Sequence, residues 1–273
     1  MKNSSISTRL IICMVVMSQL LLSSCGSVPL TGRRQVLLVS DQEVIEAGLT
    51  QYNEYMAGAA LSTDARSSAM VKSVGKKLAE STEKYLKTNG LESELKNFAW
   101  EFSLVKNNEV NAFCLPGGKI VVYEGLLSVA QTEAELAVVI GHEIGHAVAK
   151  HSNERMSQQI MTQYGMAILS QALSQKSSAV KTVATSVFGL GAQVGLMLPY
   201  SRKHEYEADY MGIVFMEIAG YDSSSAINFW TKMSAGGGNT NDFLSTHPSD
   251  SKRIAEITRR IPEAKNIGIT MNK

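Results

Sequence analysis

Residues 139–148, which read VIGHEIGHAV, constrain the fold of this 273-residue chain more than any other stretch. His142 and His146 are four residues apart, so on a helix both side chains leave the same face and can bind one ion. Glu143 follows His142 and reaches the side where water at a metal would lie, which is why zinc peptidases use this spacing. The two histidines could instead be ordinary core residues. However, burying two imidazoles and a carboxylate without a partner is costly, so the apolar flanks favour a metal centre.

A catalytic zinc site needs a third protein ligand and an open fourth position. Residues 201–209 read SRKHEYEAD and place Glu205 and Asp209 on one face of a helix. Glu205 could bind zinc, while Asp209 could accept the remaining ring N–H of a liganding histidine. The stretch would otherwise be interpreted as a solvated helix face, and His204 is the next candidate ligand.

The first two dozen residues have the pattern of an export signal. Lys2 and Arg9 precede an apolar run over residues 10–22, which is shorter than the roughly 20 residues of a membrane span and typical of a secretory signal. The run ends in Leu22-Ser23-Ser24-Cys25, which resembles a bacterial lipobox. We therefore expect a signal peptide over 1–24 and a lipid on Cys25, although an ordinary signal with a chance cysteine is the alternative. Ser27 follows, not Asp, and in a Gram-negative host the lipobox resemblance implies sorting to the outer membrane, facing the periplasm.

Cysteine content and charge limit the partners of the exported part. Cys13 lies in the signal and Cys25 at its end, so Cys114 is the single thiol left; this excludes an internal disulfide and predicts a small buried residue. Without Lys2 and Arg9, 24 basic residues face 25 acidic ones. This balance argues against a nucleic-acid partner.

Most of the remaining chain has helical periodicity. Capping-box spacing at 40–43 and 132–135 predicts helices over 40–56 and 134–150. Apolar spacing predicts a second group of helices, at 64–86, 201–219, 226–233 and 251–260. Residues 182–198 carry no charge and could form a transmembrane helix, but their Gly, Ser and Thr content favours core or site-flanking helices.

A short region between the helices has strand patterns. Alternation over 100–104 predicts a half-buried strand, and residues 111–115 and 119–123 flank Pro116-Gly117-Gly118, which predicts a hairpin. The tail after Pro262 is predicted to be peripheral. The chain is thus expected to be α+β and mostly α, with a tether over 25–39 and one domain over 40–273.

Taken together, HExxH and the SRxxExEAD stretch about sixty residues later resemble the gluzincin metallopeptidases, which include the HtpX and CAAX prenyl proteases. The stretches 111–118 and 123–127, and Thr246-His247-Pro248 with Arg253, resemble further motifs of that family. Residues 31–35, TGRRQ, are similar to its soluble periplasmic lipoprotein branch. The resemblance implies a zincin-like fold with a small sheet beside the HExxH helix.

The same resemblance assigns roles to residues. It implies one zinc per chain, held by His142, His146 and Glu205, with Glu143 as the catalytic base and Asp209 supporting a ligand. It also places His247 near the zinc, where it could stabilise the oxyanion or occupy the fourth coordination position. Arg253 could pair with a carboxylate or with the oxyanion.

The implied reaction is hydrolysis of peptide bonds by water that Glu143 activates. Asn111, Ala112 and Phe113 could offer a strand edge along which an extended substrate pairs. The strong transmembrane helices of HtpX and prenyl proteases are missing from the sequence pattern, so we expect protein or peptide substrates in the cell envelope. The alternative function is a non-catalytic envelope chaperone or scaffold with a structural metal, which would not need Glu143.

Overall fold

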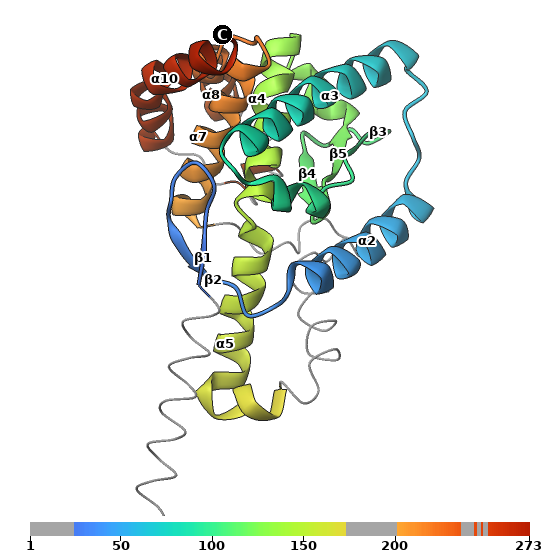
Figure 1. The fold of residues 1–273 in the computed structure, drawn as a ribbon. Coiled ribbons are helices and arrows are strands. Elements are labelled where there is room, and N and C mark those ends of the chain that lie inside the picture. Colours follow the sequence, from blue (N-terminus) through green and yellow to red (C-terminus); the bar gives the residue numbers. More distant parts are fainter. Residues whose placement is uncertain (1–24, 173–200, 236–242, 245–246, 248–250) are drawn as a thin grey trace, which may run out of the picture.

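The computed structural model describes residues 25–172, 201–235, 243–244, 247 and 251–273. This part of the chain is mostly helical, with a three-stranded sheet and a separate two-stranded hairpin (Figure 1). The α+β, mostly α architecture predicted from the sequence is confirmed. In Figure 1 the helix that carries the HExxH motif, α4, stands at the centre, with the sheet on one side and α7, α8 and α10 on the other.

The first two long helices begin where the sequence predicts, and the first has the predicted capping box. Helix α2 (Asp41–Gly58) opens with a capping box in which Ser40 Oγ accepts the Glu43 N–H and Glu43 accepts the Ser40 N–H. Helix α3 (Ala65–Thr88) opens at Asp64, whose carboxylate accepts two backbone N–H groups at 3.0 Å. It ends just before Gly90, which has a positive φ of 72°.

The sheet has the strand order β3-β5-β4, made of β3 (Glu101–Val105), β4 (Ala112–Leu115) and β5 (Lys119–Tyr123). Strands β4 and β5 form the predicted antiparallel hairpin, and β5 also pairs in parallel with β3. The hairpin turns at Gly117 and Gly118, whose φ values of 90° and 81° are unfavourable for residues with a side chain. Strand β4 is left at one edge of the sheet. The short 3-10 helices η1 (Glu92–Asn97) and η2 (Glu124–Ser128) precede and follow the sheet.

The prediction that the strand near residue 100 is half-buried is wrong. In β3 the side chain of Glu101 is exposed, and the four residues after it are buried. Helix α3 packs against the strand, and Tyr52 of α2 also reaches it, with its hydroxyl 3.2 Å from Ser103 Oγ. Ser103, a polar residue of the alternating pattern, is therefore buried with a hydrogen-bond partner instead of facing water.

Helix α4 (Glu133–Val148) begins at the predicted cap, where Thr132 Oγ1 accepts the Glu135 N–H at 3.1 Å. It ends two residues earlier than predicted, and Lys150 has a φ of 56°. That left-handed residue separates α4 from α5 (His151–Ala172), which continues below α4 in Figure 1.

Three C-terminal helices complete the body: α7 (Arg202–Ile218), α8 (Ser225–Ala235) and α10 (Ser251–Met271). The prediction of a peripheral tail after Pro262 is wrong, because α10 runs through this proline. Ala264 is fully buried, and a Cβ at Gly268 would come within 2.7 Å of the Glu217 side chain on α7. Two small residues thus let the last turns of α10 press against α7, and this packing compensates for the backbone hydrogen bond lost at Pro262.

The N-terminal hairpin pairs β1 (Cys25–Ser27) with β2 (Arg34–Val36), and β2 packs against α5. Residues 182–198, considered above as a membrane segment, lie outside the described residues. No helix in the described part of the chain is both long enough and apolar enough to cross a membrane.

Candidate metal centre

The backbones of α4 and α7 touch where both helices carry glycine. A Cβ at Gly145 would lie 2.6 Å from the carbonyl oxygen of Ala208, and one at Gly212 would lie 2.9 Å from the carbonyl carbon of Gly141. Side chains at these positions would push the helices apart. The close approach lets the Glu205 side chain of α7 reach both histidines of the HExxH segment.

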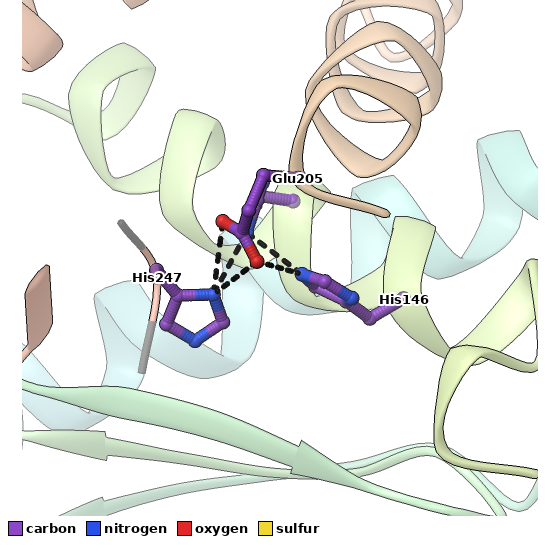
Figure 2. A group of neighbouring side chains, drawn as sticks. His146, Glu205 and His247 are labelled. Atoms are coloured by element: carbon purple, nitrogen blue, oxygen red, sulfur yellow. Dashed lines mark hydrogen bonds and ion pairs between the residues drawn. The ribbon is translucent and has the colours of Figure 1, made fainter. Parts of the chain in front are cut away.

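Four side chains converge at this crossing. His142 and His146 come from α4, Glu205 from α7 and His247 from the bend before α10. Figure 2 shows His146, Glu205 and His247 of this cluster. The Nε2 atoms of the two α4 histidines are 2.9 Å apart, and each lies 3.3–3.4 Å from an oxygen of Glu205. His247 Nδ1 is 3.2 Å from both His142 Nε2 and Glu205 Oε1. The sequence prediction therefore names all four members of this cluster.

The cluster has the dimensions of a metal site. Donors about 2.0–2.1 Å from a tetrahedral ion are separated from one another by roughly 3.3–3.4 Å, close to the 2.9–3.4 Å found here. All four residues are at most 2% exposed. Two imidazole nitrogens that meet beside a buried carboxylate suit a divalent ion with nitrogen and oxygen ligands, so the residues fit one metal ion.

Charge within the cluster is also suited to a cation. Burial alone would raise the pKa of Glu205, but His247, Arg253 and His142 hold it well below the ordinary value, so Glu205 is a carboxylate. Burial would lower the pKa of His142, but the Asp209 and Glu205 carboxylates raise it to about 9. A metal ion bound here would therefore displace a proton from His142.

Glu143 lies beside the cluster and is 2% exposed. Its carboxylate accepts the backbone N–H of Cys114 on β4, and its Oε1 lies 3.4 Å from His247 Nε2. Burial raises the pKa of Glu143, and Oε1 accepts no hydrogen bond from the described residues. A carboxylate with a raised pKa and an unused acceptor atom next to the donors can take up a proton.

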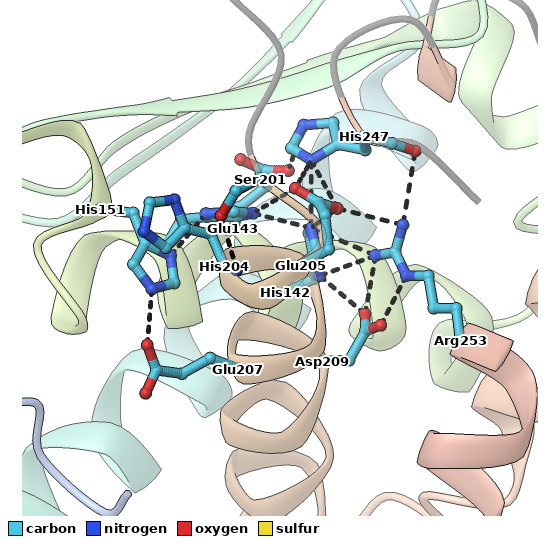
Figure 3. Close-up of polar contacts among 11 residues, drawn as sticks. His142, Glu143, His151, Ser201, His204, Glu205, Glu207, Asp209, His247 and Arg253 are labelled. Carbon is cyan, nitrogen blue, oxygen red and sulfur yellow. Dashed lines mark hydrogen bonds and ion pairs between the residues drawn. The ribbon is translucent and has the colours of Figure 1, made fainter. Parts of the chain in front are cut away.

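Asp209 and Arg253 lie behind the ligands (Figure 3). His142 Nδ1 donates to Asp209 Oδ1 at 2.8 Å, which leaves Nε2 directed at the cluster. Arg253 donates to both oxygens of Asp209, at 2.5 and 2.8 Å, and one of its nitrogens is 3.1 Å from Glu205 Oε2. Its guanidinium lies 3.5 Å from the centroid of the Trp230 ring. Arg253 thus pairs with carboxylates, one of the two roles considered from the sequence.

His204, the reserve candidate for the third ligand, lies outside the four-residue cluster. Its Nε2 is 3.1 Å from Glu154 Oε2, and its ring stacks on His151 at a centroid distance of 4.4 Å.

Residues Asn111, Ala112 and Phe113 lie at the start of the edge strand β4. The Phe113 ring packs edge-on against Tyr55 and Tyr123 in the smaller of two hydrophobic cores. Ala112 belongs to the main core, in which α4 also packs. Any contact with substrate here would therefore be made by the backbone of β4, not by the Phe113 ring.

The cysteines take different positions. Cys25 begins β1, paired with Val36. Cys114 is a free, buried thiol, as the sequence predicts, and burial raises its pKa well above the ordinary value.

A second set of polar residues lies behind His146 and was not predicted from the sequence. His146 Nδ1 is 2.8 Å from His151 Nδ1, and His151 Nε2 is 3.0 Å from Glu207 Oε2. Two features of the sequence could have indicated this set: His151 follows His146 by five residues, and Glu207 lies in the same stretch as Glu205. Helical spacing does not join them, because the two histidines belong to different helices.

Comparison with known proteins agrees with this geometry. The sequence model of peptidase family M48 matches residues 67–261, which include the cluster, Glu143 and Asp209. Mitochondrial metalloendopeptidase OMA1 of Arabidopsis thaliana is 41% identical over 177 residues, covering 64% of this chain and 34% of the relative. The protein of the same name from Schizosaccharomyces pombe is 36% identical, with 63% and 50% covered. The beta-barrel assembly-enhancing protease of Yersinia pestis is 30% identical, with 61% and 35% covered. The matched region thus spans a third to a half of these relatives.

Proposed function

This chain belongs to peptidase family M48, and from that membership we propose that it is a zinc-dependent endopeptidase acting on proteins of the cell envelope. The observation that carries the proposal is the convergence of His142, His146 and Glu205, with the buried carboxylate of Glu143 beside them. A purely structural site would have no use for that carboxylate.

The mechanism follows from the positions of the side chains. When bound, zinc supplies a Lewis acid that polarises a peptide carbonyl and makes water more acidic. Glu143 takes a proton from the attacking water and later delivers it to the leaving amine, and its raised pKa favours the uptake. Asp209 accepts the Nδ1–H of His142 and so keeps Nε2 of that ring directed at the metal position.

The edge of β4 is a suitable track for an extended substrate. The Tyr123 N–H donates to the Asn111 carbonyl, and hydrogen-bonded pairs alternate along an antiparallel ladder. Backbone groups of Ala112 and Cys114 therefore point away from β5, which agrees with the bonds from the Ala112 N–H to Asn111 Oδ1 and from the Cys114 N–H to Glu143. A substrate that pairs there would be bound through its backbone and would need to be extended, as in misfolded proteins.

We further infer that the protein is located in the cell envelope. We also infer that it belongs to a soluble lipoprotein branch related to the HtpX and CAAX proteases. The lipobox-like residues before Cys25 support a lipid anchor at the outer membrane, on the periplasmic side. One relative is named a beta-barrel assembly-enhancing protease, and this is consistent with substrates among envelope proteins.

Purified protein should cleave unfolded casein and lose this activity when a zinc chelator removes the metal. Addition of zinc should restore cleavage, because the ligands are fixed by helix packing and do not depend on the metal for their positions. Stably folded globular proteins of about the size of casein serve as the control, and we expect them to be cleaved far more slowly. Cleavage that persists in chelator, with metal analysis showing no zinc, would contradict the proposed function.

His247→Ala should increase casein cleavage several-fold without loss of zinc. His247 Nδ1 lies 3.2 Å from two ligand atoms and completes a set of four donors, whereas catalysis needs an open position. Stacking on Phe243, at a centroid distance of 4.6 Å, holds the ring there. Slower cleavage with unchanged zinc would instead assign oxyanion stabilisation, and an unchanged rate would contradict both roles.

Cys25→Ser should move the protein from the membrane fraction to the soluble periplasmic fraction. Peptidase activity in vitro should be retained, because β1 lies on the hairpin and not in the metal cluster. Cys114→Ser is the matched control and should leave the protein in membranes. If Cys25→Ser remains in carbonate-washed membranes, another segment must insert, and the lipid-anchor proposal is wrong.

A further inference from the structure

We propose that the N-terminal segment formed by residues 28–36 supports the metal ligand His146 through Arg33 and Thr31, and thereby determines how tightly the metal is held. This inference rests on the proposed function, since it concerns the same metal. The segment lies before the region 67–261 that the family model matches. Arg33 is proposed as a positioning residue that acts through other side chains.

The first link joins the ligand to a second histidine. His146 Nε2 faces the cluster, and its Nδ1 is 2.8 Å from His151 Nδ1. An Nδ1–H on His146 would donate to His151 and hold the ligand ring in the orientation needed for coordination. His142 receives the equivalent support directly from a carboxylate, Asp209, on the adjacent helix.

The second link ends in a carboxylate. His151 is fully buried, and its Nε2 donates to Glu207 Oε2 at 3.0 Å. With Nε2 as donor, His151 Nδ1 is an acceptor, so one tautomer satisfies both contacts. The ring also stacks on His204, which restricts its rotation.

The third link comes from the N-terminal segment, more than 170 residues away in sequence. Thr31 Oγ1 donates to one oxygen of Glu207, and Arg33 Nε donates to the other at 2.7 Å. The two terminal nitrogens of Arg33 make a bidentate pair with Glu154, at 2.9 and 2.7 Å. These ion pairs are largely shielded, because the side chains of Arg33, Glu154 and Glu207 are only 13%, 10% and 6% exposed.

The segment itself is held rigidly enough to transmit such support. Val28 is 1% exposed, and its N–H donates to the Arg33 carbonyl at 2.8 Å. Between them the chain turns tightly at Leu30 and Gly32, whose φ values are 70° and 67°. The guanidinium of Arg33 therefore holds two carboxylates. Glu207 orients His151 and, through it, His146, and Glu154 contacts His204.

The test measures zinc release from the full-length, zinc-loaded protein into excess colorimetric chelator. Glu207→Gln and Arg33→Gln should each release zinc faster, by roughly 10-fold, the lower end of the effect of supporting residues on metal affinity. Arg34→Gln is the matched control: it changes the neighbouring arginine, which is exposed, and should behave as wild type. Arg33→Lys should be intermediate, since an ammonium cannot bind both carboxylates as a fork.

A double-mutant cycle separates this route from simple destabilisation. If Arg33 acts through Glu207, adding Arg33→Gln to Glu207→Gln should accelerate zinc release little further. The proposal would be overturned if the two substitutions multiplied each other's effect on the rate of zinc release. It would also be overturned if a folded Arg33→Gln protein had a lower melting temperature but released zinc at the wild-type rate. Should Arg33→Gln fail to fold, Thr31→Val, compared with Thr31→Ser, provides the same readout. Wild-type protein that binds no zinc would overturn the proposed function itself, and is thus a distinguishable result.

Discussion

Glu143→Gln is expected to reduce casein cleavage by roughly 10²–10⁴-fold while the protein keeps its zinc. Oε1 of Glu143 accepts no hydrogen bond from the described residues, so an amide there removes the group that accepts the proton from water and returns it to the amine. Glutamine preserves the volume and can still accept the Cys114 N–H. The fold and the four-residue cluster should therefore be unaffected.

Glu133→Gln is the appropriate control for this variant, because Glu133 lies on the same helix with its side chain about half exposed. It should have wild-type kcat/KM. The measurement combines steady-state cleavage with metal analysis of the same samples. Near-normal cleavage by Glu143→Gln would remove Glu143 from the mechanism, whereas loss of zinc would indicate a structural role.

Two pairs of candidate site residues could be predicted from the sequence because each pair is local, although the choice of Glu205 as a ligand came from the resemblance to a known family. His142 and His146 on α4, and Glu205 and Asp209 on α7, are four residues apart, and helical periodicity alone places each pair on one face. What periodicity cannot supply is the distance between the helices. That distance is set by glycines such as Gly145, which allow the backbones to touch.

Other features depended on contacts that are remote in sequence and could not be predicted. Arg33 reaches Glu207 across 174 positions, and no local pattern marks a pair of this kind. Likewise, Pro262 suggested the end of a helix, but Ala264 and Gly268 make the following turns fit against α7. In both cases burial against a distant element outweighed the local signal.

Glu205→Ala is expected to remove most of the bound zinc and to reduce proteolysis to background. Glu205 is the sole carboxylate of the described cluster, and without it two imidazoles from α4 would face His247 alone. The same substitution also deprives the buried Arg253 of one partner, 3.1 Å away. Glu205→Gln, which keeps the volume and a hydrogen-bond acceptor for Arg253, should therefore fold better than Glu205→Ala but still bind zinc poorly.

Lys203→Ala, an exposed change in the same first turn of α7, should retain one zinc per chain and full activity, whereas His146→Ala should lose zinc as Glu205→Ala does. Stoichiometric zinc in Glu205→Ala would mean that another group completes the site. His204 is held 3.1 Å from Glu154, outside the cluster, so His247 is the residue already within reach. The double variant Glu205→Ala/His247→Ala distinguishes these cases: if zinc is lost only from the double variant, His247 is the substitute ligand, and if zinc persists even there, the assignment of Glu205 as a ligand is wrong.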